Sequence, residues 1–201
     1  MTNQDWHVTQ VGQCIIPSRE VLVSEPIVPY RLYRFLTDLE EILLKESDDA
    51  IRLQQICPLV RHLLDHSPWI ELQFLMPDPE TGWSVNTLYD EPDYPLTIQI
   101  VSWMPGVKSS IHNHATWGLV AVLDGQEKNT FWQQATTEGL PLKKTGDRIL
   151  DPGDIITFMP NAIHQIEALG DDPVISLNLY GETEFEQRFQ FDPDTGAATL
   201  F

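Results

Sequence analysis

Hydrophobic residues in the first part of the chain recur at the spacing of an amphipathic helix. Within residues 30–45 they fall at Leu32, Phe35, Leu36, Leu39, Ile42 and Leu43. A second run of this kind starts at Asp48 or Asp49, either of which suits an N-cap, and ends near His66. Pro58 lies inside this second run and predicts a break or a kink. We therefore expect two helices here.

The pattern changes near Gly82, where short runs of β type begin. They are separated by turns, and the clearest are LTIQIVSW, GLVAVLDG, KNTFWQQA, IITFMP, HQIEAL and VISLNLYG. Strands at intervals of about eight to twelve residues are typical of a sandwich or a barrel. We expect a mainly β protein of one structural domain overall, with N-terminal helices packed on a barrel. The boundary between the two parts is placed between residues 1–82 and residues 83–201.

The first 28 or so residues are expected to be irregular, since Pro17, Pro26 and Pro29 interrupt them. The start also lacks a basic segment followed by an apolar core, so no secretory signal is expected. A cytoplasmic location follows as the expectation.

The net charge of the protein makes some kinds of binding partner unfavourable. The chain of 201 residues carries 30 acidic and 12 basic residues and a formal net charge of −18. Such a charge repels phosphate backbones and anionic lipid, so neither nucleic acid nor a membrane is expected as a partner. No apolar run approaches the roughly 20 residues that a membrane-spanning helix needs.

Candidate chemistry begins with two histidines one residue apart, His112 and His114. If a strand begins after the turn MPGVKSS, residues i and i+2 project to the same face, here into a barrel interior. His164 follows a turn and could reach back to this pair. Three imidazoles on one face leave open positions on a metal, as catalysis requires, but imidazole suits iron, zinc, copper and nickel alike.

The other histidines are interpreted differently. His62 and His66 lie four residues apart in the second helical run, which would also suit a metal on a helix face. The glutamate of a metalloprotease helix is absent and Arg61 adjoins them, so we take them as surface or helix-packing residues. His7 is given no role.

Two motifs of this sequence resemble those of a known protein family. The string G-x5-H-x-H-x3-G-x6-G, from Gly106 to Gly125, resembles the first cupin motif, with Gly118 where most cupins have a glutamate. A second resemblance is to the second cupin motif, in the form that thiol dioxygenases carry. It consists of DPGD at 151–154, Pro160, His164 and SLNLYG at 176–181. That family includes cysteine dioxygenase and the 3-mercaptopropionate dioxygenases. The resemblance spans roughly residues 88–180 and implies a cupin double-stranded β-helix, or jelly-roll barrel.

The resemblance further implies a mononuclear non-haem iron(II) enzyme with a three-histidine facial triad at His112, His114 and His164. Its reaction would add both atoms of O2 to the sulfur of a small thiol, 3-mercaptopropionate or cysteine-like, to give a sulfinate. Three neutral histidines keep a ferrous centre at charge +2, and a bound cation favours ionisation of a thiol. Another divalent metal, such as zinc or nickel, could occupy the site in a purified sample.

Two catalytic features depart from the family. Gly118 matches the place where mammalian cysteine dioxygenases have a cysteine crosslinked to a tyrosine, so the matching Tyr180 is expected to be a free phenol. The family string Ser-x-His-x-Tyr is here Ser176-x-Asn178-x-Tyr180. Asn178 can hydrogen-bond but cannot change its charge near neutral pH. Whether it tunes the reaction or stops it stays open.

The anchor for a substrate carboxylate also differs. Cysteine dioxygenases place an arginine on a strand before the histidine pair, and that place falls near Asn86 in a stretch without arginine or lysine. The mercaptopropionate enzymes use an arginine after the tyrosine, and Arg188 lies about one residue from that place. A guanidinium pairs well with a carboxylate, so Arg188 is a candidate anchor. The alternative is a surface ion pair with Glu184 or Glu186.

Three further side chains could line the substrate cavity: Trp103, Trp117 and Met159. Two other functions fit the same residues. One is a cupin dioxygenase acting on a small diketone-like chelating substrate, which would not need Arg188. The other is a metal-binding or sensing cupin without catalysis. The expected partners are a small thiol and O2, and the sequence leaves the oligomeric state open between monomer and homodimer.

Overall fold

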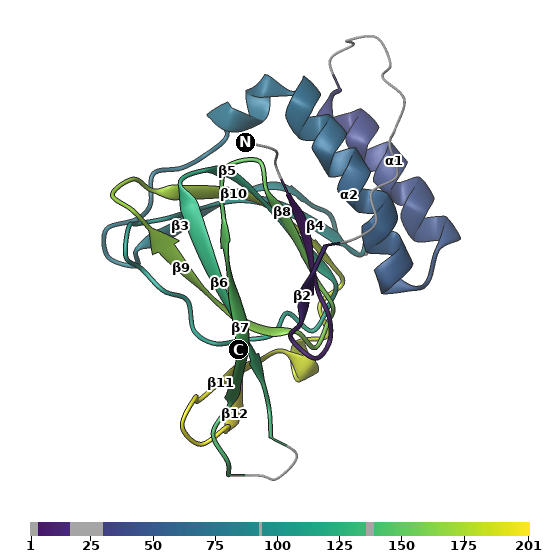
Figure 1. Cartoon of the computed structure of the whole chain (residues 1–201). Coiled ribbons are helices and arrows are strands. Elements are labelled where there is room, and N and C mark those ends of the chain that lie inside the picture. Colours follow the sequence, from purple (N-terminus) through teal and green to yellow (C-terminus); the bar gives the residue numbers. More distant parts are fainter. Residues whose placement is uncertain (1–3, 17–29, 93, 136–138) are drawn as a thin grey trace.

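The computed structural model describes residues 4–16, 30–92, 94–135 and 139–201. They form two β sheets that face each other and a separate two-stranded hairpin, with two helices covering the outer side of the larger sheet (Figure 1). The protein is therefore mainly β with an N-terminal helical part, as the sequence predicts. Pro17, Pro26 and Pro29 lie outside the described residues.

The two helices match the two periodic runs. They are α1 (Leu32–Lys45) and α2 (Asp49–His66), and a short 3-10 helix, η1 (Pro68–Leu72), follows. Asp48 caps α2 by accepting a hydrogen bond from the backbone N–H of Ile51 at 3.0 Å. Of the break or kink expected at Pro58, the break is wrong, because α2 runs unbroken through this residue. The residues Ile56, Cys57 and Val60 on either side are buried, and this packing offsets the missing hydrogen bond.

The larger sheet has seven strands in the order β2-β1-β8-β5-β10-β4-β3. Its strands are β1 (Asp5–Val8), β2 (Cys14–Ile15), β3 (Trp83–Asp90), β4 (Leu96–Trp103), β5 (Gly118–Asp124), β8 (Ile155–Phe158) and β10 (Val174–Gly181). The expectation of an irregular start is wrong for β1 and β2. β1 pairs in parallel with β8, so the start of the chain is part of the sheet.

The smaller sheet has three strands in the order β7-β6-β9. They are β6 (Gln126–Gln133), β7 (Lys143–Leu150) and β9 (Ile163–Leu169). A separate hairpin near the end of the chain joins β11 (Phe189–Phe191) to β12 (Ala198–Leu200), and the turn η2 (Phe185–Gln187) precedes it. All six strands predicted from the short β-type runs are present.

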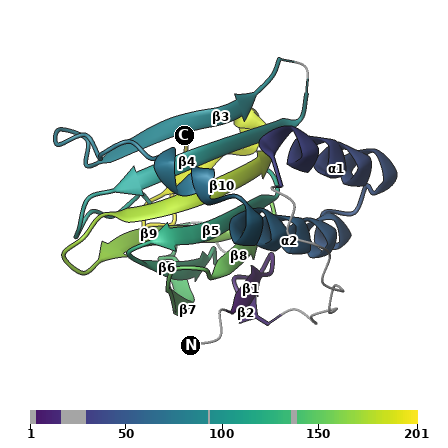
Figure 2. The same ribbon diagram turned by 90° about the horizontal axis from the view of Figure 1, so that it is seen from above.

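The larger sheet separates two hydrophobic clusters. On its outer face, residues such as Leu119 and Leu177 pack against Phe35, Leu53 and other side chains of the helices. Figure 2 shows α1 and α2 lying over this face. The inner face carries a second cluster: Val8, Val120, Val122, Phe131, Leu150, Ile156, Phe158 and Ala162.

Strand alternation decides which residues of β10 enter the barrel. Leu177 and Leu179 belong to the cluster beneath the helices, so the intervening Ser176, Asn178 and Tyr180 face the interior. The barrel thus acquires a line of polar side chains. In the described part of the chain, no helix is long and apolar enough to cross a membrane.

Candidate metal centre

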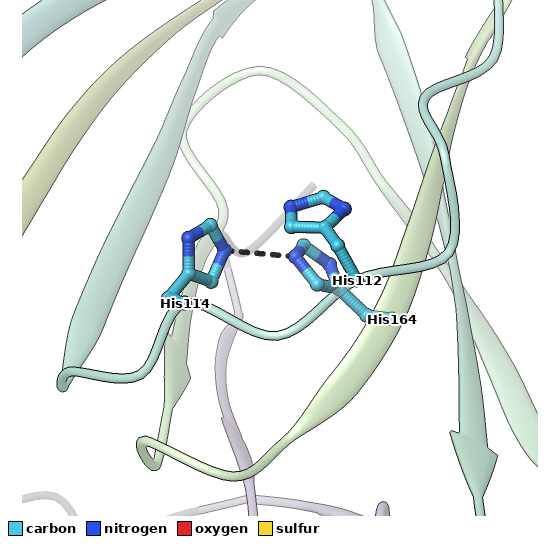
Figure 3. A group of neighbouring side chains, drawn as sticks. All are labelled: His112, His114 and His164. Carbon is cyan, nitrogen blue, oxygen red and sulfur yellow. Dashed lines mark hydrogen bonds between the residues drawn. The ribbon is translucent and has the colours of Figure 1, made fainter. Parts of the chain in front are cut away.

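The three histidines that the sequence singles out come together in the barrel. His112 and His114 lie in the connection between β4 and β5, so the expectation that a strand carries them is wrong. Instead, His112 forms an isolated β-bridge with His164 on β9, and each backbone N–H donates to the other's carbonyl oxygen at 2.9 Å. Figure 3 shows the three rings converging from these two segments.

The spacing of the imidazoles fits one metal ion. One nitrogen from each ring can be chosen so that all three lie within 4.8 Å of one another. The Nε2 atoms of His114 and His164 are 2.9 Å apart. Two nitrogens at right angles on a metal, each at about 2.1 Å, would be separated by about 3 Å. The donor set therefore fits a metal bound on one face.

Hydrogen bonds at the outer ring nitrogens orient two of the imidazoles. His112 Nδ1 lies 3.0 Å from the carbonyl oxygen of Ser110, and His164 Nδ1 lies 2.9 Å from Oδ1 of Asn129. Both acceptors assign the ring proton to Nδ1, which leaves the Nε2 lone pair for a metal.

Burial keeps these histidines in the state that a metal requires. They are 8%, 8% and 3% exposed in chain order. Burial lowers the pKa of His112 to about 4 and holds the pKa values of His114 and His164 well below 6.5. The three rings are neutral at physiological pH, as ligands must be.

Asn113, between the two histidines, fixes their loop to the C-terminal segment. Its side chain accepts from the backbone N–H of Phe189 at 2.7 Å and donates to the carbonyl oxygen of Gln187 at 2.9 Å. The next residue but one, Ala115, has a left-handed φ of 54°. Its N–H donates to the Pro160 carbonyl at 3.1 Å, which holds this strained turn. Sequence reasoning missed Asn113, although its place between two candidate ligands was a signal.

Tyr180 lies against one ligand and ends a chain of hydrogen bonds. Its ring centroid is 4.7 Å from that of His114. The phenol donates to Oδ1 of Asn178 at 3.0 Å, and Nδ2 of Asn178 donates to Oγ of Ser176 at 2.9 Å. An ideal Cβ at Gly118 would lie 3.2 Å from the Tyr180 ring, so glycine leaves room for the phenol there.

Arg188 lies near the same group. Its positive charge lowers the pKa values of both His112 and His114, and burial lowers its own pKa. Among the described residues Arg188 forms no ion pair, so the alternative of a surface pair with Glu184 or Glu186 is wrong. Its Nε is buried without a hydrogen-bond partner.

Phe201 connects Arg188 with the histidines. The Arg188 guanidinium lies 4.5 Å from the Phe201 ring centroid, and this ring stacks on His112 with centroids 5.3 Å apart. Sequence reasoning did not identify Phe201, because only the β11–β12 hairpin brings residue 201 back to residue 112.

Two expected cavity residues lie elsewhere. Trp117 and Met159 pack in the cluster beneath the helices, on the outer side of the larger sheet. Trp117 also lines a cavity of about 560 Å³ together with Asp49 and Arg52 of α2. This placement corrects the expectation that they line the barrel interior, since alternation puts residue 117 on the same side as Leu119.

The remaining residues singled out from the sequence are Trp103 and the two helix histidines, His62 and His66. Trp103 lies at the end of β4, with its ring centroid 6.0 Å from that of Trp83. His62 and His66 pack on each other at 4.3 Å, and His62 packs on Tyr30 at 4.5 Å. Their interpretation as helix-packing residues is confirmed.

Several solved structures are similar to part of this chain. No family model matches the chain. Similar solved structures include KdgF from Halomonas sp., with 19% identity over 54% of this chain and 88% of that one (TM-score 0.42). A cupin superfamily protein from Desulfitobacterium hafniense is 18% identical over 57% and 88% (TM-score 0.43). Oxalate oxidase in complex with glycolate is 13% identical over 61% and 56% (TM-score 0.40).

The chain thus folds as two facing β sheets, with two helices on the outer side of the larger sheet. The sheets, which are antiparallel except for the β1–β8 pair, enclose a buried three-histidine cluster that can hold a metal ion.

Proposed function

We propose that the protein is a mononuclear non-haem iron(II) thiol dioxygenase whose substrate is a small thiol carrying a carboxylate, such as 3-mercaptopropionate. The observation that carries the proposal is the position of Arg188. A half-buried guanidinium with an unpartnered Nε acts electrostatically on two neutral histidines that can bind a metal. This combination suits a substrate with an anionic group at one end and a metal-binding sulfur at the other.

The reaction is R–S⁻ + O2 → R–SO2⁻. Two S–O bonds form and the O–O bond breaks, so that sulfur is oxidised and oxygen is reduced, and no further reductant is needed. Iron(II) bound by His112, His114 and His164 would supply a dication that favours the thiolate and the redox chemistry that O2 requires.

Arg188 would hold the substrate carboxylate. Its planar guanidinium can donate two parallel hydrogen bonds to the two carboxylate oxygens. Such a pair fixes both the position and the orientation of the substrate. Cysteamine, which lacks a carboxylate, would lose this interaction.

Tyr180 would be a neutral phenol that donates its single proton to Asn178, so that its oxygen can accept a hydrogen bond. Burial raises its pKa, so the phenol keeps its proton throughout the physiological range. Asn178 holds the phenol oxygen and is itself held by Ser176. Neither the amide nor the hydroxyl titrates near neutral pH, so this string orients Tyr180 without exchanging a proton with it.

Oxygen uptake by anaerobically iron(II)-loaded protein tests the proposal. Cysteine, 3-mercaptopropionate and cysteamine are offered separately, and the product is identified by mass. We expect uptake to be fastest with 3-mercaptopropionate. Arg188→Ala should lower kcat/KM by about ten- to hundredfold, mainly through KM, because one charged hydrogen-bonded contact is lost.

Arg34→Ala is the matched control. Arg34 is exposed on α1 and pairs with Asp38 at 3.1 Å, so its loss should leave the kinetics unchanged. No uptake with any thiol, despite tightly held iron, would contradict the proposal. It would favour a diketone-cleaving dioxygenase or a sensing protein, and Asn178→His would then be the next variant.

A further inference from the structure

Glu127 is a buried carboxylate at the second position of β6. It is 2% exposed, and strand alternation places it inside the barrel with Asn129 and Phe131. Within residues 4–16, 30–92, 94–135 and 139–201, no cationic side chain forms an ion pair with it. Ionising a buried carboxylate without such a partner is unfavourable, because the charge leaves water without compensation. A nearby positive charge would offset this cost.

Asn129 connects Glu127 to the candidate metal centre. Nδ2 of Asn129 donates to Oε1 of Glu127 at 2.8 Å, and Oδ1 of Asn129 accepts from Nδ1 of His164 at 2.9 Å. A carboxylate only accepts hydrogen bonds, so Glu127 fixes the orientation of the amide. The amide in turn fixes the ring proton of His164 on Nδ1. The result is a chain from carboxylate to amide to imidazole.

The charge of the three histidine ligands indicates a role for the hydrogen-bonded series from Glu127 through Asn129 to His164. Three neutral histidines leave a dication uncompensated, since none of them carries a negative charge. A carboxylate hydrogen-bonded behind a ligating histidine raises the basicity of that ligand. We propose that Glu127 is the charge-balancing carboxylate of the metal centre, acting through Asn129 and His164 instead of as a ligand.

This proposal rests on metal binding at the three histidines, and it does not depend on the oxidation of a thiol. In the metal-free protein, burial raises the pKa of Glu127 to about 7, against the opposing effect of the Asn129 hydrogen bond. Below neutral pH the group is therefore mostly protonated. A dication bound at His164 favours the ionised form, so metal binding releases the proton of Glu127.

The groups around Glu127 contribute no competing titration between pH 6 and pH 8. Across the barrel it faces Tyr180, whose pKa is raised far above this range. On the flanking strands its partners are Leu150 of β7 and Ala168 of β9. His164, which it reaches through Asn129, is already neutral.

Cobalt(II) titration of the metal-free protein, followed by calorimetry at pH 6, 7 and 8, tests the inference. In the wild type, affinity should rise about fivefold from pH 6 to 7 and about twofold more by pH 8, as expected for loss of one proton. Measurement in two buffers of different ionisation enthalpy should show about one proton released at pH 6. In Glu127→Gln both effects should disappear, and binding at pH 8 should be weaker than in the wild type.

Glu167→Gln is the matched control. Glu167 lies on β9 and pairs at the surface with Lys108 and Lys128, so its loss removes the same formal charge away from the barrel. It should bind cobalt(II) like the wild type. If Glu127→Gln keeps both the affinity and the pH slope while His164→Ala loses binding, the inference is overturned and the metal centre stands. If His164→Ala binds as tightly as the wild type, both are overturned.

Discussion

Replacing Glu127 with glutamine should stabilise the metal-free protein at pH 8 by about 3 kcal/mol. Burial raises the pKa of this carboxyl from 4.5 to about 7. A difference of about 2.5 pKa units at 1.36 kcal/mol each gives about 3 kcal/mol. Glutamine has the same shape and can still accept the hydrogen bond from Asn129, so the chain to His164 is preserved.

The sign of the effect follows from proton binding. The folded protein holds the Glu127 proton more tightly than the unfolded chain does. Ionisation therefore lowers the free energy of unfolding progressively as the pH rises from about 4.5 to about 7, and the full cost is present above pH 7. The low pKa values of the three histidines have their own pH dependence, but it is common to both proteins and cancels in the difference.

Urea unfolding with a chelator present, at pH 5, 6, 7 and 8, measures this difference. The advantage of Glu127→Gln should be smallest at pH 5 and should grow with pH. In the control Glu167→Gln, the lost contact with Lys108 is a surface one, and no growth over this range is expected. A difference that stays constant with pH, or a variant less stable than wild type at pH 8, would refute the reasoning.

Three further substitutions test the packing around the site. Asn113→Ala removes two side-chain hydrogen bonds to the C-terminal segment, so urea unfolding should show a loss of about 2 kcal/mol, and metal affinity should fall; an unchanged affinity would argue against a role in holding the ligands. Gly118→Ala puts a methyl group 3.2 Å from the Tyr180 ring and should cost about 1 kcal/mol in the same assay, whereas a stabilised variant would show that the ring has room. Phe201→Ala removes the ring stacked on His112, so a chelator should extract the metal faster; an equal rate would mean that Phe201 does not cover the site.

Much of the barrel could be predicted from the sequence because its strands are bounded by turns and rich in β-forming residues. VISLNLYG was expected as a strand, and β10 covers the same residues, Val174–Gly181. The start of the chain could not be predicted in this way. β1 is four residues long and is held by its pairing with β8, about 150 residues away, which no local pattern records.

The residues of the candidate site, like the strands, could be predicted only in part. The three histidines stand in a recognisable spacing, so their convergence was predictable even though the strand assigned to His112 and His114 was wrong. Trp117 was misplaced because a shift of one position reverses the face of a strand. Glu127 and Phe201 depend on the register between distant strands, so the sequence alone gave no reason to join them to the histidines.

The most direct test of the proposed thiol oxidation is the fate of isotopically labelled oxygen. Iron(II)-loaded protein is given 3-mercaptopropionate under ¹⁸O2, and the product is analysed by mass. We predict a sulfinate with both oxygens labelled, formed one-to-one with oxygen consumed, and lost in His164→Ala. A product with oxygen from water, or oxygen uptake without a sulfinate, would contradict the account.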